Sequence, residues 1–189
     1  PGIQGREHIY GGDQQAAEKI RMFQSFYPRQ RAASAREIPY EALHRQGFRG
    51  VIFDIDNTLV PHDAPADQET EEFFCRLREL GYATCLLSNN KERRVAAFAG
   101  QVSSPYIFKA GKPSVKGYEK AMELMGTDRE TTLFVGDQLF TDVYGANRAG
   151  LYTVLVKPIH PKEEIQIVVK RKLERLVLWF YERDRRKRQ

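Results

Sequence analysis

Cysteine is scarce in this sequence, and long apolar runs are missing from it. Cys75 and Cys85 are the two cysteines among 189 residues, too few for a disulfide framework, so a reducing compartment is expected. Neither has a CxxC partner, which favours packing over chemistry for both. No apolar stretch reaches the roughly 18 to 20 residues that cross a bilayer. The composition therefore argues against a disulfide-stapled domain and offers no membrane span.

Three common ligand-binding patterns are absent as well. There is no GxxxxGK[ST] loop, which excludes a P-loop nucleotide-binding protein. An EF-hand loop starting at Asp54 needs glycine at its sixth position and glutamate at its twelfth, where this chain has Leu59 and Pro65. The four histidines show no zinc-ligand spacing. His62, just after the first acidic motif, is the histidine that we expect nearest a substrate.

Charge is unevenly distributed along the chain. A hydrophobic content of 41% and a charged content of 29% fit a globular domain. The formal net charge is +5, yet residues 157–189 hold eleven Lys/Arg against five Asp/Glu, a net of +6, which leaves about −1 for the rest. The chain is therefore near neutral with a basic tail.

Three segments are predicted. Residues 1–21 show little helical or strand pattern, and we expect an added or disordered segment there, with Met22 as a plausible native start. Residues 22–160 are predicted to form the main domain. Residues 161–189 are predicted to form a basic amphipathic helix.

Short β-branched runs alternate with amphipathic helices through the main domain. Asp67 is placed to cap one helix and Gly81 to end it. The alternation predicts a parallel sheet covered by helices on both faces, a Rossmann-like three-layer α/β sandwich. The expected strands are 50–54, 82–88, 106–110, 131–137 and 152–158, and the expected helices are 67–81, 91–100, 114–126 and 141–150.

Polar side chains follow four of these strands. The carboxyl ends of parallel strands meet at one edge of the sheet, where sites form. Any one of these residues is more simply a turn former or a helix cap, but four together predict a catalytic site. In "VIFDIDNTLV" the two aspartates project to the same face, so a divalent cation, a reaction at phosphorus or a plain turn would each explain them. The residues are Asp54 and Asp56, Ser88 with Asn89 and Asn90, Lys112, and Asp137 with Asp142.

These motifs resemble those of the haloacid-dehalogenase-like (HAD) phosphatases. The likeness covers residues 36–160 and rests on DxDxT, the strand ending in serine, the Lys112-Pro113 pair and GDxxxTD. The phrases "LLSNNKERR" and "VGDQLFTDVYGANRAGLYT" resemble subfamily IIIA, a group that includes phosphatidylglycerophosphate phosphatases. About 25 residues separate the first motif from the next strand, and one helix consumes them, so no inserted cap domain is expected.

The resemblance implies a role for each matching residue. Asp54 would be the nucleophile that forms an aspartyl-phosphate, and Asp56 the general acid and base. Mg²⁺ would be held by Asp54, the backbone carbonyl of Asp56 and Asp137. The remaining roles are phosphoryl stabilisation by Ser88 and Lys112, substrate contacts from Thr58, Asn89 and Lys112, and orientation of a metal-bound water or Lys112 by Asp142. Lys109 is close enough in sequence to be an alternative to Lys112 as the phosphoryl-stabilising lysine. We favour Lys112, because Lys109 is expected inside a strand and so to project elsewhere.

An open site suits a phosphate carried on something large. The favoured substrate is phosphatidylglycerophosphate, and a soluble metabolite or a phosphoprotein is the alternative. The tail pattern indicates a helix docked on the sheet, a helix that touches an anionic membrane with Trp179 and Tyr181 near the interface, or both, with residues 165–176 docked and the end on lipid. The expected location is cytoplasmic, or on the matrix side of an organelle, and peripheral to a membrane. The apolar face of the tail is Ile165, Val168, Val169, Leu173, Leu176 and Phe180.

A different class of function also remains. The basic tail would then bind RNA or a protein partner, with the phosphatase fold as its scaffold. "RDRRKRQ" has few interleaved aromatics, so sequence reading of nucleic acid is disfavoured. The intact set of acids also argues against a scaffold, because a binding module has no use for Asp56.

Overall fold

The computed structural model describes residues 23–160 and 165–186, with the side chains of 165–173 left aside. The segment 1–21 that the sequence sets apart lies outside the described residues. Six strands form one sheet in the order β1-β6-β5-β2-β3-β4, and all neighbouring pairs are parallel. The strands are β1 Gln30–Ala32, β2 Gly50–Phe53, β3 Ala83–Leu87, β4 Tyr106–Ile107, β5 Thr132–Gly136 and β6 Tyr152–Val156.

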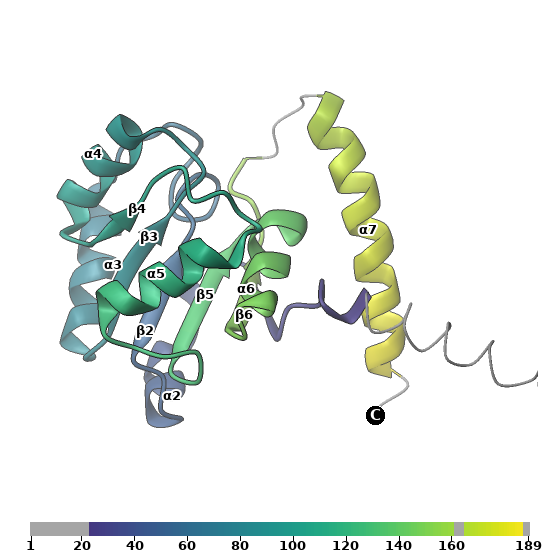
Figure 1. The fold of residues 1–189 in the computed structure, drawn as a ribbon, viewed down its shortest axis with the longest axis horizontal. Coiled ribbons are helices and arrows are strands. Elements are labelled where there is room, and N and C mark those ends of the chain that lie inside the picture. Colours follow the sequence, from purple (N-terminus) through teal and green to yellow (C-terminus); the bar gives the residue numbers. More distant parts are fainter. Residues whose placement is uncertain (1–22, 161–164, 187–189) are drawn as a thin grey trace, which may run out of the picture.

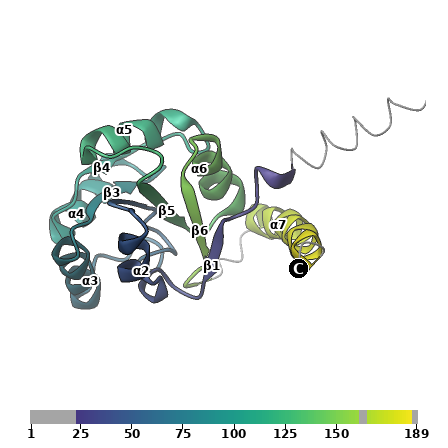
Figure 2. The same cartoon turned by 90° about the horizontal axis from the view of Figure 1, so that it is seen from below.

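Helices cover both faces of this sheet. Figure 2 shows α2, α3 and α4 on one face and α5 and α6 on the other. The three layers confirm the predicted Rossmann-like sandwich. The helices are α2 Tyr40–Arg45, α3 Gln68–Glu79, α4 Glu92–Val102, α5 Val115–Met125, α6 Tyr144–Arg148 and α7 Ile165–Arg186, with short 3-10 and π turns at Ala35–Glu37 and Leu139–Val143.

The central strands are apolar on both sides because both sides are covered. Consecutive residues of β2 enter different cores, with Ile52 packing beside Tyr118 and Phe134, and Phe53 packing beside Phe74. This alternation follows from the period of two in a strand. It fixes the register of β2, because a shift of one residue would exchange the two cores.

Two local predictions differ from the structure. The expected strand 106–110 ends after two residues, at Ile107, and Lys109 beyond it has a left-handed backbone with φ 44°. Lys109 thus lies beyond β4 and not inside it. The edge strand β1 was not predicted, since Gln30–Ala32 is too short and polar to show a strand pattern.

The C-terminal helix α7 runs opposite to the strands (Figure 1), and it lies on the side of the molecule that carries β1 and β6 (Figure 2). Glu174 accepts a hydrogen bond from Leu139 N–H, just past the end of β5. Arg185, near the other end of α7, lines the same cavity as Gly150 and Leu151, which come just before the start of β6. The basic end of α7 is therefore at the opposite edge of the sheet from the residues that follow the strands.

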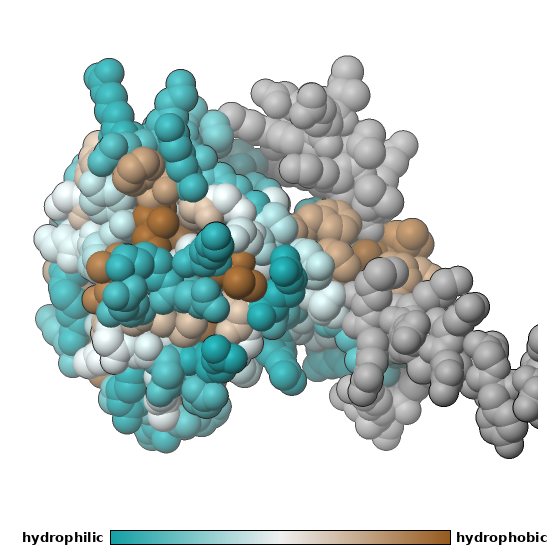
Figure 3. All heavy atoms as spheres, in the orientation of Figure 1, coloured by the Kyte–Doolittle hydropathy of each residue, from teal (hydrophilic) through white to brown (hydrophobic). Residues whose placement is uncertain are grey.

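The docked face of α7 follows the predicted face only in part. Phe180, on the predicted face, stacks on Phe23 with ring centroids 5.8 Å apart. Val177 is buried in a cluster with Leu139, Val143 and Leu155, whereas Leu176 is 51% exposed. The placement of Leu176 on the docked face was therefore wrong. In Figure 3 the apolar side chains of α7 gather beside the core. The boundary between the main domain and the tail at residue 160 stays a prediction.

Candidate active site

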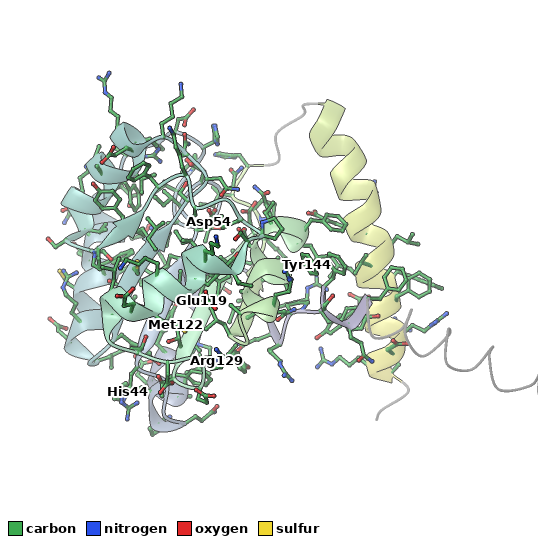
Figure 4. All side chains as sticks on the ribbon, in the orientation of Figure 1. His44, Asp54, Glu119, Met122, Arg129 and Tyr144 are labelled. Atoms are coloured by element: carbon green, nitrogen blue, oxygen red, sulfur yellow. The ribbon has the colours of Figure 1, made fainter. Side chains whose placement is uncertain are left out.

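The site forms where β2, β3 and β5 end. β2 lies between β3 and β5, with Phe53 opposite Leu86 and Val135. The next residue, Asp54, donates its N–H to Val135 O at 2.9 Å, and Figure 4 shows its side chain at this end of the sheet. The shared edge predicted from the sequence is therefore present.

Asp54 is buried and paired with a lysine. Lys112 Nζ lies 2.5 Å from Asp54 Oδ1, and Thr58 Oγ1 donates to Asp54 Oδ2 at 3.3 Å. The backbone of Lys112 is fixed by Asn89, whose Oδ1 accepts from Lys112 N–H at 2.8 Å and whose Nδ2 donates to Lys112 O at 3.3 Å. The structure thus brings Lys112 to Asp54, while Lys109 is exposed. In this structure, Asn89 supports the lysine.

Asp142 holds the other side of the lysine. Its Oδ1 lies 2.7 Å from Lys112 Nζ, and its Oδ2 accepts from Gln138 N–H at 3.0 Å. A Cβ on Gly136 would come within 2.6 Å of Asp142 Oδ2, so the glycine makes this close approach possible. Both oxygens of Asp142 are therefore engaged within the protein.

Asp137 faces Asp54 across a shared hydroxyl. Thr58 Oγ1 lies 3.3 Å from Asp137 Oδ1, the same distance as from Asp54 Oδ2. A hydroxyl carries one proton, so it donates to one of the two carboxylates at a time. The other carboxylate keeps an oxygen free for a ligand.

Burial and crowding set the protonation of this cluster. Burial raises the pKa of Asp54, and the Lys112 ammonium offsets part of that rise. Burial, followed by the charges of Asp54 and Asp142, raises the pKa of Asp137. Burial would lower the pKa of Lys112, but the charges of Asp142 and Asp54 outweigh it and raise that pKa, so the ammonium stays charged. Negative charge is in excess here.

This excess fits a divalent cation. Asp54, Asp137 and Asp142 each offer a carboxylate oxygen, and these oxygens lie within 4.8 Å of one another. Hard oxygen donors are what Mg²⁺ and related ions prefer. Because Asp142 is engaged by Lys112 and Gln138, Asp54 and Asp137 are the better ligands of the three.

Asp56 points into a separate hydrogen-bond network. Its Oδ1 accepts from Asp63 N–H at 2.8 Å and from the Arg94 guanidinium at 3.1 Å, and its Oδ2 accepts from Asn90 Nδ2 at 3.2 Å. Burial opposes ionisation, but these hydrogen bonds and the charge of Arg94 together lower the pKa of Asp56. His62 Nδ1 lies 4.0 Å away.

Sequence reasoning missed Arg94, which also donates to Ala64 O at 2.6 Å. The available signal was its position in the first turn of α4, the helix that follows β3 and so starts at this edge. Ser88 is buried, and its Oγ accepts from Asn90 N–H at 3.1 Å. Asn90 thus links the two residues, because it donates its N–H to Ser88 and its side-chain amide to Asp56.

Comparison with known proteins identifies the family of this chain. The HAD-hydrolase-like family model matches residues 109–164. "Probable phosphatase YqeG" of Bacillus subtilis (strain 168) is 37% identical over 154 residues, covering 81% of this chain and 90% of that protein. This chain belongs to the HAD-like hydrolases and is a phosphatase.

Two longer relatives carry a more specific name. "Phosphatidylglycerophosphate phosphatase 1, chloroplastic/mitochondrial" of Arabidopsis thaliana is 29% identical over 168 residues, covering 80% of this chain and 46% of that protein. "Phosphatidylglycerophosphate phosphatase 1, chloroplastic" of Chlamydomonas reinhardtii is 27% identical over 177 residues, covering 88% and 62%. The chain spans less than two thirds of the length of both.

Proposed function

We propose that this phosphatase removes the terminal phosphate of phosphatidylglycerophosphate through an aspartyl-phosphate on Asp54. The observation that carries the chemistry is the buried Asp54 held between Lys112 and Thr58 at the carboxyl edge of the sheet. The two phosphatidylglycerophosphate phosphatases that resemble most of this chain support the lipid substrate.

The first step forms a bond between an Asp54 oxygen and phosphorus while the bond from phosphorus to the ester oxygen breaks. Asp56 donates a proton to that leaving oxygen. In the second step Asp56 takes a proton from water, whose oxygen attacks the same phosphorus. Phosphate leaves and the Asp54 carboxylate is restored.

The other residues hold charge and position. Lys112, kept charged by Asp142, stabilises negative charge on the phosphoryl oxygens, and the Ser88 hydroxyl donates to one of them. Thr58 orients Asp54. Asp54, Asp137 and the backbone carbonyl of Asp56 would hold Mg²⁺, which when bound neutralises the crowded carboxylates and the incoming phosphate.

The lipid substrate places the protein at a membrane surface. None of the described helices is both long and apolar enough to cross a bilayer. Contact with the anionic leaflet is therefore proposed to be peripheral, on the cytoplasmic side or the matrix side of an organelle.

The test is phosphate release from phosphatidylglycerophosphate in vesicles with Mg²⁺. Asp54→Asn and an EDTA-treated sample are expected to release none, and Asp128→Asn, an exposed carboxylate outside the site, is expected to match the parent protein. Turnover well above that on soluble phosphate esters supports the lipid substrate. If soluble esters were hydrolysed while the lipid stayed intact, the phosphatase assignment would hold and the lipid substrate would be rejected. RNA binding unaffected by Asp54→Asn would favour a binding module.

A further inference from the structure

An exposed isoleucine is hydrogen-bonded to the loop that carries Asp56 and Thr58. Ile159, 37% exposed, follows β6 between Lys157 and His160, all of them at the surface. Its N–H donates to Asn57 O at 3.0 Å, and His160 N–H lies 3.3 Å from Asn57 Oδ1. Because Asn57 comes between Asp56 and Thr58, this apolar side chain is tied to the loop that carries the site.

Exposed cations flank the site on both sides. The site residues follow β5 and β2, which are central in the sheet order. Lys157 follows β6 on one side, and Lys91 and Lys109 follow β3 and β4 on the other, all three exposed. The N–H of Lys109 donates to Asn90 O at 3.0 Å, which ties it to the partner of Asp56.

Two of the three exposed carboxylates near these cations have partners of their own. Among the described residues of the connections that follow β2 to β6, counted to the first residue of the next helix, the exposed carboxylates are Asp63, Asp67 and Glu92. Asp63 lies 3.2 Å from His62, and Asp67 accepts from Thr70 N–H at 2.8 Å. Figure 3 shows hydrophilic side chains projecting from this end of the molecule. We call Lys91, Lys109, Lys157 and Ile159 the carboxyl-edge rim. The rim combines positive charge with one apolar side chain, as an anionic bilayer surface requires.

The basic end of α7 lies too far from the active site to present a membrane substrate to it. A helix of this length spans about 33 Å, and it runs from the rim toward the opposite edge. Arg185 lines a cavity of about 600 Å³ there, together with Arg29 and Arg148. A bilayer bound at that edge would be separated from Asp54 by the length of the strands.

We infer that the carboxyl-edge rim is the surface on which this phosphatase meets an anionic bilayer, with Ile159 entering the headgroup layer and the basic end of α7 pointing away. The inference rests on the proposed lipid substrate and adds the orientation in which the site reaches it. It differs from the prediction that the end of the tail touches lipid.

The test measures binding of the full chain to phosphatidylcholine vesicles with and without phosphatidylglycerol. The rim variant is Lys91→Gln with Lys109→Gln and Lys157→Gln. The matched control removes the same number of charges from α7, through Arg183→Gln, Arg185→Gln and Arg186→Gln. A lysine near an anionic leaflet contributes roughly five-fold in affinity, so the rim variant is expected to bind about 100-fold more weakly, and the control within about five-fold of the parent.

A second pair of variants tests the apolar contact. Ile159→Ala is expected to weaken binding about ten-fold, whereas Leu124→Ala, an exposed leucine near the other end of α5, should not change it. If Trp179→Ala weakened vesicle binding and Ile159→Ala did not, the apolar contact would belong to α7 and the inference would be overturned. Hydrolysis of a soluble ester by every variant shows that each is folded.

The outcomes separate the two proposals. Three results would overturn the assignment of the rim as the bilayer contact. They are loss of vesicle binding in the α7 control but not in the rim variant, equal loss in both, and binding that does not depend on phosphatidylglycerol. Rim-dependent binding to an RNA homopolymer and none to vesicles overturns it as well. Rim-dependent vesicle binding without hydrolysis of phosphatidylglycerophosphate keeps the surface and rejects the substrate, because binding is measured without turnover.

Discussion

Lys112 carries a buried ammonium group between two carboxylates, so it is expected to matter for both the stability of the fold and the activity. Its side chain is 4% exposed and lies 2.5 Å from Asp54 and 2.7 Å from Asp142. Removing one member of a buried ion pair leaves the other charges unpaired, which costs about 3 to 5 kcal/mol. Asp54 can take up a proton, since burial raises its pKa, so the lower end applies.

We therefore expect Lys112→Met to lower the free energy of unfolding by about 3 kcal/mol and to abolish turnover. The measurement is urea unfolding, paired with phosphate release. Lys120→Met is the control, because Lys120 pairs with Glu123 at 2.8 Å on the surface and should change stability by less than about 1 kcal/mol. Equal effects of the two variants would contradict the assigned ion-pair network.

Arg94 is expected to act through Asp56. Arg94→Ala removes the guanidinium that holds Asp56 Oδ1 at 3.1 Å. Its loss raises the pKa of Asp56, which favours the protonated carboxyl, but the carboxyl is then no longer held in place, so proton donation to the leaving oxygen should suffer from lost positioning. General acid catalysis contributes about 10²-fold or more, and it matters most when the leaving group is a poor one. We expect kcat on an alkyl phosphate to fall about 100-fold and kcat on p-nitrophenyl phosphate to fall far less.

Two variants complete this test. Arg94→Lys keeps the charge and should recover part of the alkyl phosphate activity. Arg93→Ala, at the exposed neighbour, should behave like the parent on both esters. An equal fall on both substrates would mean that Arg94 only supports the fold through its bond to Ala64 O.

At the scale of elements, α3 offers a prediction about pH. Asp67 caps the helix by accepting from Thr70 Oγ1 at 2.6 Å and from Thr70 N–H at 2.8 Å, and these bonds lower the pKa of Asp67. A carboxyl whose pKa is lower in the folded state stabilises the fold above its unfolded pKa, about 4, and this contribution is lost as pH falls through the folded value.

Asp67→Ala should therefore cost about 1 kcal/mol near neutral pH, and the difference from the parent should shrink below about pH 4. Unfolding followed across this range checks it. Ser114, the N-cap of α5, makes no side-chain capping bond, so Ser114→Ala should have little effect at any pH. A difference for Asp67→Ala that persisted unchanged into acid would contradict the assigned cap.

Elements with a local signal were predictable, and those defined by partners were not. Asp67 and the apolar period of α3 specify that helix from the sequence alone. β1 exists because Gln30–Ala32 can add to the exposed edge of β6, a long-range event that leaves no local pattern. Similarly, residues 141–143 were predicted as the start of a helix, but they lie in the π turn Leu139–Val143, which brings Asp142 back to Gly136 and Lys112.

At the scale of the whole molecule, topology made the location of the site predictable. Parallel strands carry whatever follows them to one edge, so Asp54, Lys112 and Asp137 meet although they are far apart in the chain. What topology leaves open is side-chain direction. The sequence did not reveal that Asn89 bonds to the backbone of Lys112, and its predicted contact with substrate stays a prediction. Arg94 was not predicted at the site, because only the start of α4 brings it beside Asp56.

The contact of α7 with the π turn links the tail to the site. Val177, 5% exposed, packs with Leu139 and Val143, the two ends of the turn that contains Asp142. Truncating a buried apolar side chain costs about 1 to 3 kcal/mol, more where the site cannot collapse. If α7 belongs to the same cooperative unit as the sheet, that cost appears in global unfolding, and the loosened turn also weakens the hold of Asp142 on Lys112.

Val177→Ala should accordingly lower the free energy of unfolding by about 2 kcal/mol and reduce kcat on a soluble ester. Its neighbour Leu176, 51% exposed, is the matched control, and Leu176→Ala should stay within about 0.5 kcal/mol of the parent with unchanged kcat. Denaturant unfolding and steady-state kinetics measure both. If Val177→Ala proved as silent as Leu176→Ala, α7 would not be docked on the π turn in solution. A loss of stability without any loss of kcat would keep the docking and remove its link to Asp142.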